Sequence, residues 1–210
     1  IGQSSPVLGE GTVAGSLAQL QIEHAVSGFA VADITATVKD VTTAPAWDAS
    51  IDANLPDAES LSPMLNGDPR IALQTSGTPD DYQAQAKVEL TTTETGPVTI
   101  DADVGGSTEM LDIRSLVAQL SESGGELSAE GQLTFASLEG DIRGQWQALS
   151  WPLQGEPQFS SAQGSFDAKG SAESFNANLA TVVDGEAIPG GQWTATLDGS
   201  ATELGNFVLL

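Results

Sequence analysis

Few residues of this chain could do chemistry, and their spacing does not gather them into a site. His24 is the only histidine and cysteine is absent, so a transition-metal site would need carboxylate ligands from distant parts of the chain. His24 falls beside Ile22 and Val26 on the apolar side of an alternating run, which favours a histidine near a strand end over a general base. The G-x-S-x-G elbow of a serine nucleophile does not occur.

The carboxylates are numerous but do not form a recognisable constellation. Asp101 and Asp103 point to the same outer face of a predicted strand, a spacing compatible with Ca²⁺, yet neither an EF-hand loop nor a calcium-binding nonapeptide repeat is present. Glycoside hydrolysis requires two acids facing a sugar cleft, and nothing selects such a pair among 29 acidic residues. We therefore expect no catalytic residue, no metal site and no cofactor, and we do not expect an enzyme.

The elements that would position these residues are predicted to be strands. Apolar and polar residues alternate with a period of two, which indicates antiparallel strands with one dry and one wet face. Gly, Pro, Asp and Ser clusters interrupt the alternation at short intervals, as turns require. The best helix candidate, Asp57 to Leu65, contains Pro63, so we expect a loop or a single turn there. The alternating runs are Leu20–Val26, Ile34–Val38, Trp47–Ala53, Tyr82–Leu90, Val98–Val104, Leu127–Phe135, Phe166–Ala168, Phe175–Leu179 and Trp193–Leu197.

Composition excludes several classes of partner. Six basic against 29 acidic residues give a net charge of -23, which argues against nucleic acid because phosphate binding needs clustered Lys and Arg. The same charge disfavours attraction to an anionic membrane surface. The chain starts at Ile1 without Met and ends in the apolar run 207–210, so we interpret it as an internal fragment of a longer protein.

A faint internal repeat favours an elongated β architecture. Gly77 to Ala86 and Gly170 to Leu179 share a glycine, four small or acidic residues, an aromatic residue, and an amide-small-amide-apolar alternation. Repeated strand-turn units of this kind are typical of elongated folds. We expect one segment over residues 1–210, with loose repeat units at about 71–116 and 163–210.

The dry face allows two interpretations. The chain has only 11 aromatic residues, and many inward positions are Ala or Gly, where a sandwich core usually has larger residues. Taken alone, the residues favour a close-packed sandwich over a shallow open trough. Lys39, Lys87, Arg114 and Lys169 fall on the polar phase, so the apolar phase is almost free of charge, which fits both.

The most specific motif lies between Leu138 and Leu153. Its spacing, Gly144-x-Trp146-x-x-Leu149-x-Trp151-Pro152-Leu153, resembles a recurring signature of the TamB family. Three further segments follow in the order found in that family, and the resemblance extends from about residue 71 to residue 204. These segments are 163–170, 174–179 and 188–191.

The resemblance implies a fold, a location and partners. TamB belongs with the AsmA-like and bridge-like lipid transfer proteins, which are anchored in the inner membrane and cross the Gram-negative periplasm. The implied fold is all-β: an elongated, curled antiparallel-type sheet, built from degenerate strand-turn repeats, that forms an apolar trough (a β-taco). The implied function is a hydrophobic conduit for phospholipids between the inner and outer membranes, or help in outer-membrane protein assembly. The implied partners are phospholipid acyl chains, outer-membrane protein clients and a TamA-like outer-membrane protein.

In this reading the apolar positions of the strands line the lipid groove. The alternative is a structural or adhesive acidic β-repeat module with a closed core. The predicted groove residues are Ile22, Ile34, Val38, Ile51, Ala84, Val88, Ile100, Ala102, Leu133, Phe135, Trp146, Leu149, Trp151, Phe166, Phe175, Leu179, Trp193 and Leu197.

Overall fold

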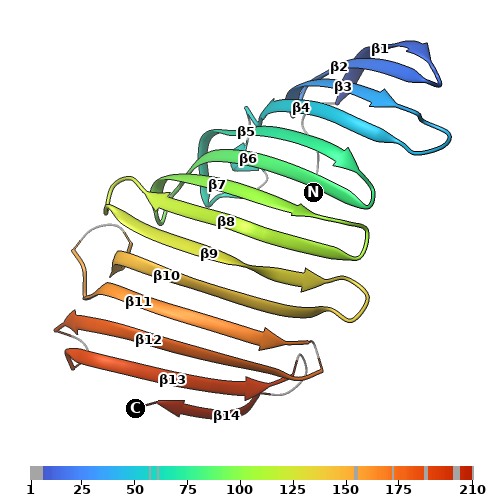
Figure 1. Cartoon of the computed structure of the whole chain (residues 1–210). Coiled ribbons are helices and arrows are strands. Elements are labelled where there is room, and N and C mark those ends of the chain that lie inside the picture. The colour runs from blue at the N-terminus through green and yellow to red at the C-terminus, as the bar shows by residue number, and fades with distance from the viewer. Residues whose placement is uncertain are drawn as a thin grey trace.

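The protein is one antiparallel sheet in which each strand pairs with the next strand of the chain. The computed structural model describes residues 7–56, 58–60, 62–153, 156–171, 173–186, 189–200 and 204–209. Its 14-stranded sheet has the order β1 to β14 without a crossover, and Figure 1 shows the strands stacked from the N-terminal to the C-terminal end. The strands are β1 (Leu8–Ser16), β2 (Gln19–Ser27), β3 (Val31–Lys39), β4 (Ala46–Asn54), β5 (Leu65–Thr78), β6 (Asp81–Thr92), β7 (Gly96–Gly106), β8 (Met110–Leu120), β9 (Gly125–Thr134), β10 (Glu139–Trp151), β11 (Phe159–Gly170), β12 (Phe175–Gly185), β13 (Gly191–Gly199) and β14 (Leu204–Leu209).

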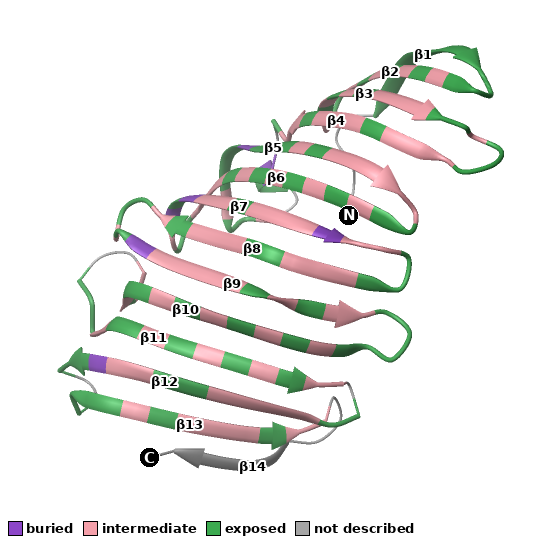
Figure 2. Ribbon diagram, viewed as in Figure 1, coloured by how far each residue is buried: buried purple, intermediate pink, exposed green. Residues whose placement is uncertain are grey.

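The period-two alternation of the sequence becomes an alternation of exposure. In β6 the residues from Tyr82 to Leu90 are half-buried at every second position and exposed between them, because successive side chains of a strand point to opposite faces. Figure 2 shows this banding along β2, β6 and β11. The predicted all-β, curled antiparallel sheet is confirmed. Within the helix candidate, the structure has a 3₁₀ turn at Ala58–Ser60, as expected, while Asp57 and Leu61 lie outside the described residues.

The sheet is a single layer without a closed core. Among the described residues only Ala58, Val98 and Val183 are buried hydrophobic side chains, and no large side chain is fully buried. The close-packed sandwich that the small inward residues favoured is therefore wrong for this part of the chain. Two sheets packed face to face would bury large side chains between them, whereas here Ala and Gly lie on a face that no second layer covers. No described helix is long and apolar enough to cross a membrane.

Bulges change the phase of the alternation in β8 and in β11. In β8, the residues that pair with β9 skip from Ile113 to Leu116. These two side chains therefore lie on the same face although they are three residues apart. In β10 Ala148 has a positive φ of 52°, and in β11 the pairing with β12 shifts between Ser161 and Gln163. A bulge adds one unpaired residue to a strand. Side chains beyond the bulge therefore point to the face opposite the one that strict alternation predicts.

Candidate functional site

Four rows of residues cross the sheet on its apolar side, and we call them the apolar rungs. Each rung joins residues that lie directly opposite one another on successive strands, and directly opposite residues share a face. The rungs start at Gly9, Gly11, Val13 and Gly15 of β1 and run without a break to β13. The rung from Gly9 continues through Val26, Ala32, Ala53, Ile71, Val88, Ile100, Ala118, Leu127, Trp146, Gly164, Thr181 and Trp193.

None of the four rungs contains Asp, Glu, Lys or Arg from β1 to β13. Their polar members are His24, Thr75, Tyr82 and Thr181. Arg70 and Arg143 lie opposite Glu89 and Glu130 on the other face. The sequence predicted the other four basic residues on that same polar face. An uninterrupted uncharged strip on one face of an acidic protein is the main chemical feature of the structure.

The structure places most of the predicted groove residues on these rungs. Leu149 and Trp151 lie beyond Ala148, whose φ is positive, and they pair with Ser161 and Phe159. Phe135 lies in the turn after β9 rather than in a strand, and it is 41% exposed. The residues on the rungs are Ile22, Ile34, Val38, Ile51, Ala84, Val88, Ile100, Ala102, Leu133, Trp146, Phe166, Phe175, Leu179, Trp193 and Leu197.

Sequence reasoning missed the contribution of β8. Leu111, Ile113 and Leu116 lie on the rungs opposite Leu133, Gly131 and Ala129. The bulge between Ile113 and Leu116 hides this strand from a search for strict alternation. A run of three aliphatic residues spaced by two and then by three was the available signal.

Tryptophan side chains on the apolar face satisfy their N–H groups within the protein. Trp47 Nε1 donates to Thr75 Oγ1 at 3.1 Å, and Trp146 Nε1 donates to Ser161 Oγ at 2.7 Å. Trp193 Nε1 donates to the carbonyl oxygen of Pro189 at 3.1 Å. A buried indole N–H usually needs such a partner, whereas an indole in water has no need of one. These three N–H groups therefore keep a hydrogen-bond partner where water is excluded.

His24 lies on the rung between Gly11 and Ile34 and is half-buried. Its imidazole occupies the space beside β1 where side chains at Gly9 and Gly11 would otherwise lie, since a Cβ on Gly9 would approach the ring Nε2 within 2.7 Å. No group of three or more His, Asp or Glu side chains that could hold a metal ion occurs among the described residues. His24 therefore packs across β1.

The opposite face carries the charges in small ion-pair and amide networks. Arg114 bridges Asp103 and Asp112 at 3.1 and 3.7 Å, and Gln85 also donates to Asp103. Asp103 is thus held by two protein donors, Arg114 and Gln85. Lys87 donates to Glu89 at 3.0 Å, which lowers the pKa of Glu89. The benefit of that pair is present at neutral pH and is lost as the pH falls through the lowered pKa.

The Arg143–Glu130 pair gives a test of how much these surface pairs matter. The two side chains approach to 2.6 Å but remain 72% and 50% exposed, and the pairing raises the pKa of Arg143. Exposed pairs contribute little because water screens them. We expect Arg143→Gln to leave the thermal unfolding midpoint unchanged in both low and high salt. A fall of many degrees that disappears in high salt would contradict this view of the polar face.

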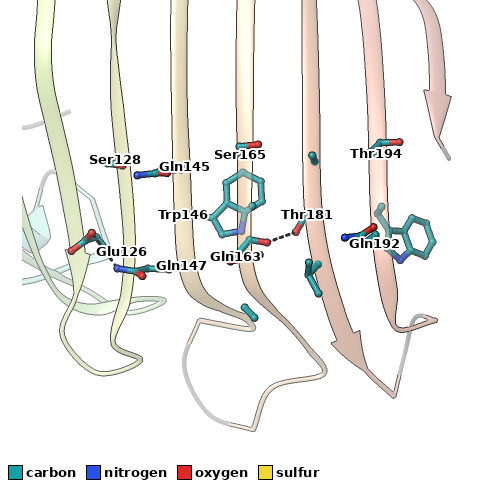
Figure 3. A pocket seen from close by; sticks show the side chains of 15 residues that line it. Glu126, Ser128, Gln145, Trp146, Gln147, Gln163, Ser165, Thr181, Gln192 and Thr194 are labelled. Atoms are coloured by element: carbon teal, nitrogen blue, oxygen red, sulfur yellow. Dashed lines mark hydrogen bonds between the residues drawn. The ribbon is translucent and has the colours of Figure 1, made fainter.

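A hollow spans β9 to β13 (Figure 3). It has a volume of about 550 Å³. It is lined by two rows of mainly uncharged polar residues, and by Trp146, Gly164, Thr181 and Trp193 of the rung that runs between these rows. The first row is Ser128, Gln145, Ser165, Ala180 and Thr194, and the second is Glu126, Gln147, Gln163, Val182 and Gln192. Gln147 donates to Glu126 at 3.3 Å, so the one carboxylate there is already partly satisfied.

Comparison with known protein families agrees with this geometry. Residues 125–205 match the family model described as TamB, N-terminal domain. This match supports assignment to the TamB family. No match was found among curated proteins or among solved structures. The matched residues include β9 to β13, where the Trp146 motif, the bulge of β11 and the end of the apolar rungs lie.

The match supports a TamB-like role in envelope biogenesis. TamB proteins are envelope proteins of Gram-negative bacteria with a non-enzymatic role in transport and assembly, and the family is associated with TamA. The open all-β sheet is the architecture expected of a TamB β-taco.

Proposed function

We propose that this TamB chain is a periplasmic segment of a longer inner-membrane-anchored protein and that its apolar face conducts phospholipids between the two membranes. The observation that carries the proposal is the set of four uncharged rungs, which continue through β1 to β13 on a face without a second layer. At a strand spacing of ~4.8 Å, this strip is on the order of 60 Å long.

The energetics of the strip suit acyl chains. Each buried CH₂ of a lipid contributes ~0.8 kcal/mol, and large contiguous apolar surfaces on soluble domains usually mark interaction sites. Because most members of every rung are Ala, Gly or aliphatic residues, neighbouring positions offer an acyl chain similar environments. Similar sites in series keep the barriers between them low, so movement along the strip needs no catalytic residue.

Two indoles with hydrogen-bonded N–H groups support contact with an apolar ligand. Trp47 and Trp146 donate to Thr75 and Ser161, which are themselves on the apolar face. Both hydrogen bonds let the rings lie under hydrocarbon without leaving an N–H unsatisfied. The same face would also accept the apolar side of an unfolded outer-membrane strand, so help in assembly of such clients with a TamA-like partner remains part of the proposal.

Native mass spectrometry of the purified chain tests the lipid proposal. We expect the chain, purified from a Gram-negative host without detergent, to carry phospholipid that organic extraction removes and that incubation with phosphatidylethanolamine vesicles restores. The matched control is the same chain after extraction and incubation with buffer alone. A bare mass in all three preparations, together with a strand-dominated circular dichroism spectrum, would refute the conduit.

A further inference from the structure

We infer that Gly164 keeps the apolar face clear by letting the indole of Trp146 lie flat across β11, and that this clearance determines whether acyl chains pass β10 and β11. The inference rests on the proposed lipid function. It identifies the residues that would control the free space of the path at its most aromatic point.

The contact between Trp146 and Gly164 is so close that a side chain at residue 164 would displace the indole ring. The two residues lie directly opposite each other. A Cβ on Gly164 would overlap the indole, and its three nearest neighbours all belong to the Trp146 ring. Figure 3 shows the ring drawn across β11 rather than standing away from its own strand.

The neighbouring rung repeats the arrangement in the opposite direction. Phe166 of β11 lies opposite Gly144 of β10, and its ring fills the space of a Cβ there. The Trp146 and Phe166 rings are 6.5 Å apart with an interplanar angle of 24°. Two rings that each cover a glycine on the other strand and are nearly parallel form one low platform on the sheet.

A hydroxyl pair fixes the orientation of the indole. Ser161 Oγ accepts from Trp146 Nε1 at 2.7 Å and lies 2.7 Å from Thr181 Oγ1. Ser161 reaches the apolar face because of the bulge between Ser161 and Gln163. Displacing the Trp146 indole from its flat position would therefore break its hydrogen bond to Ser161 and would also raise the ring into the acyl path.

Gly164→Ala tests this inference, and Gly190→Ala is its control. Gly190 precedes β13 and lies outside the apolar rungs, and a Cβ there meets Asp184 Oδ1 at 3.4 Å and the Val183 carbonyl oxygen at 3.5 Å, which are ordinary contacts. We expect Gly164→Ala to lose bound phospholipid in native mass spectrometry while Gly190→Ala keeps it. We also expect the Trp146 indole N–H resonance, assigned with Trp146→Phe, to shift in Gly164→Ala alone.

The double variant Trp146→Ala/Gly164→Ala separates obstruction from misfolding. Removing the raised ring is expected to restore lipid, even if Gly164→Ala by itself folds poorly. A double variant that still lacks lipid would overturn the inference, and so would a Gly164→Ala chain that retains as much lipid as wild type. If the wild-type chain binds no lipid, the proposed function fails. The indole resonance then decides the structural part, and an unshifted signal in Gly164→Ala overturns it.

Discussion

Ala177→Asp is expected to abolish phospholipid retention while the isolated sheet still folds. Ala177 is half-buried on an apolar rung between Ala168 and Leu197. Without lipid, the open face lets a carboxylate stay hydrated, so stability falls only modestly. Under acyl chains the same charge loses its water, which costs roughly 3 kcal/mol or more, equivalent to a more than ~100-fold weaker binding.

The control for this substitution is Ala180→Asp in the same strand. Ala180 is exposed on the polar face between Ser165 and Thr194, so the new carboxylate stays in water whether or not lipid is bound. Native mass spectrometry and thermal melting of both variants make the comparison. Equal lipid content in the two would show that the apolar rungs do not contact lipid.

The pH dependence of Ala177→Asp gives a second readout. Desolvation raises the pKa of a carboxyl group above its usual ~3.9. Lipid retention by this variant should therefore recover as the pH falls through the raised pKa, because the protonated acid can be buried at lower cost. Ala180→Asp should retain lipid at every pH, and a failure of Ala177→Asp to recover in acid would point to a packing defect instead.

An arginine on the strip is expected to block transport without unfolding the protein. Ala129 lies on an apolar rung between Leu116 and Gly144. Ala129→Arg places a long side chain across the acyl path, but its stem packs on apolar surface while its guanidinium reaches water at the open face. In a closed core the same change would have no route to water and would unfold the domain.

The measurement is thermal melting combined with complementation of a bacterium that lacks the gene for this protein. We expect Ala129→Arg to melt close to wild type and to fail in complementation. Ser128→Arg, the adjacent residue on the polar face between Val117 and Gln145, should melt and complement like wild type. Ala84→Arg and Ala195→Arg repeat the test on β6 and β13. Full activity of all three apolar-face variants would remove this segment from the transport path.

The sequence alone determined the strands and the face of most residues. The alternation of residues such as Tyr82, Ala84 and Val88 with Gln83 and Lys87 fixes both, because a strand has a period of two and each residue type has a strong preference for one side of the water boundary. The absence of charge from the apolar phase was visible in the same way. The Trp146 motif then indicated the family that residues 125–205 confirm.

Only the tertiary structure decided how the apolar face is used. Small inward residues such as Ala102 and Ala129 fit a packed sandwich as well as an open sheet, since the difference lies in whether a second layer covers them. The bulges between Ile113 and Leu116 and between Ser161 and Gln163 shift the phase by one residue, which local sequence does not show because a bulge forms between paired strands. The overlap of Trp146 with Gly164 joins residues 18 positions apart, and a contact between strands exists only once their register is set.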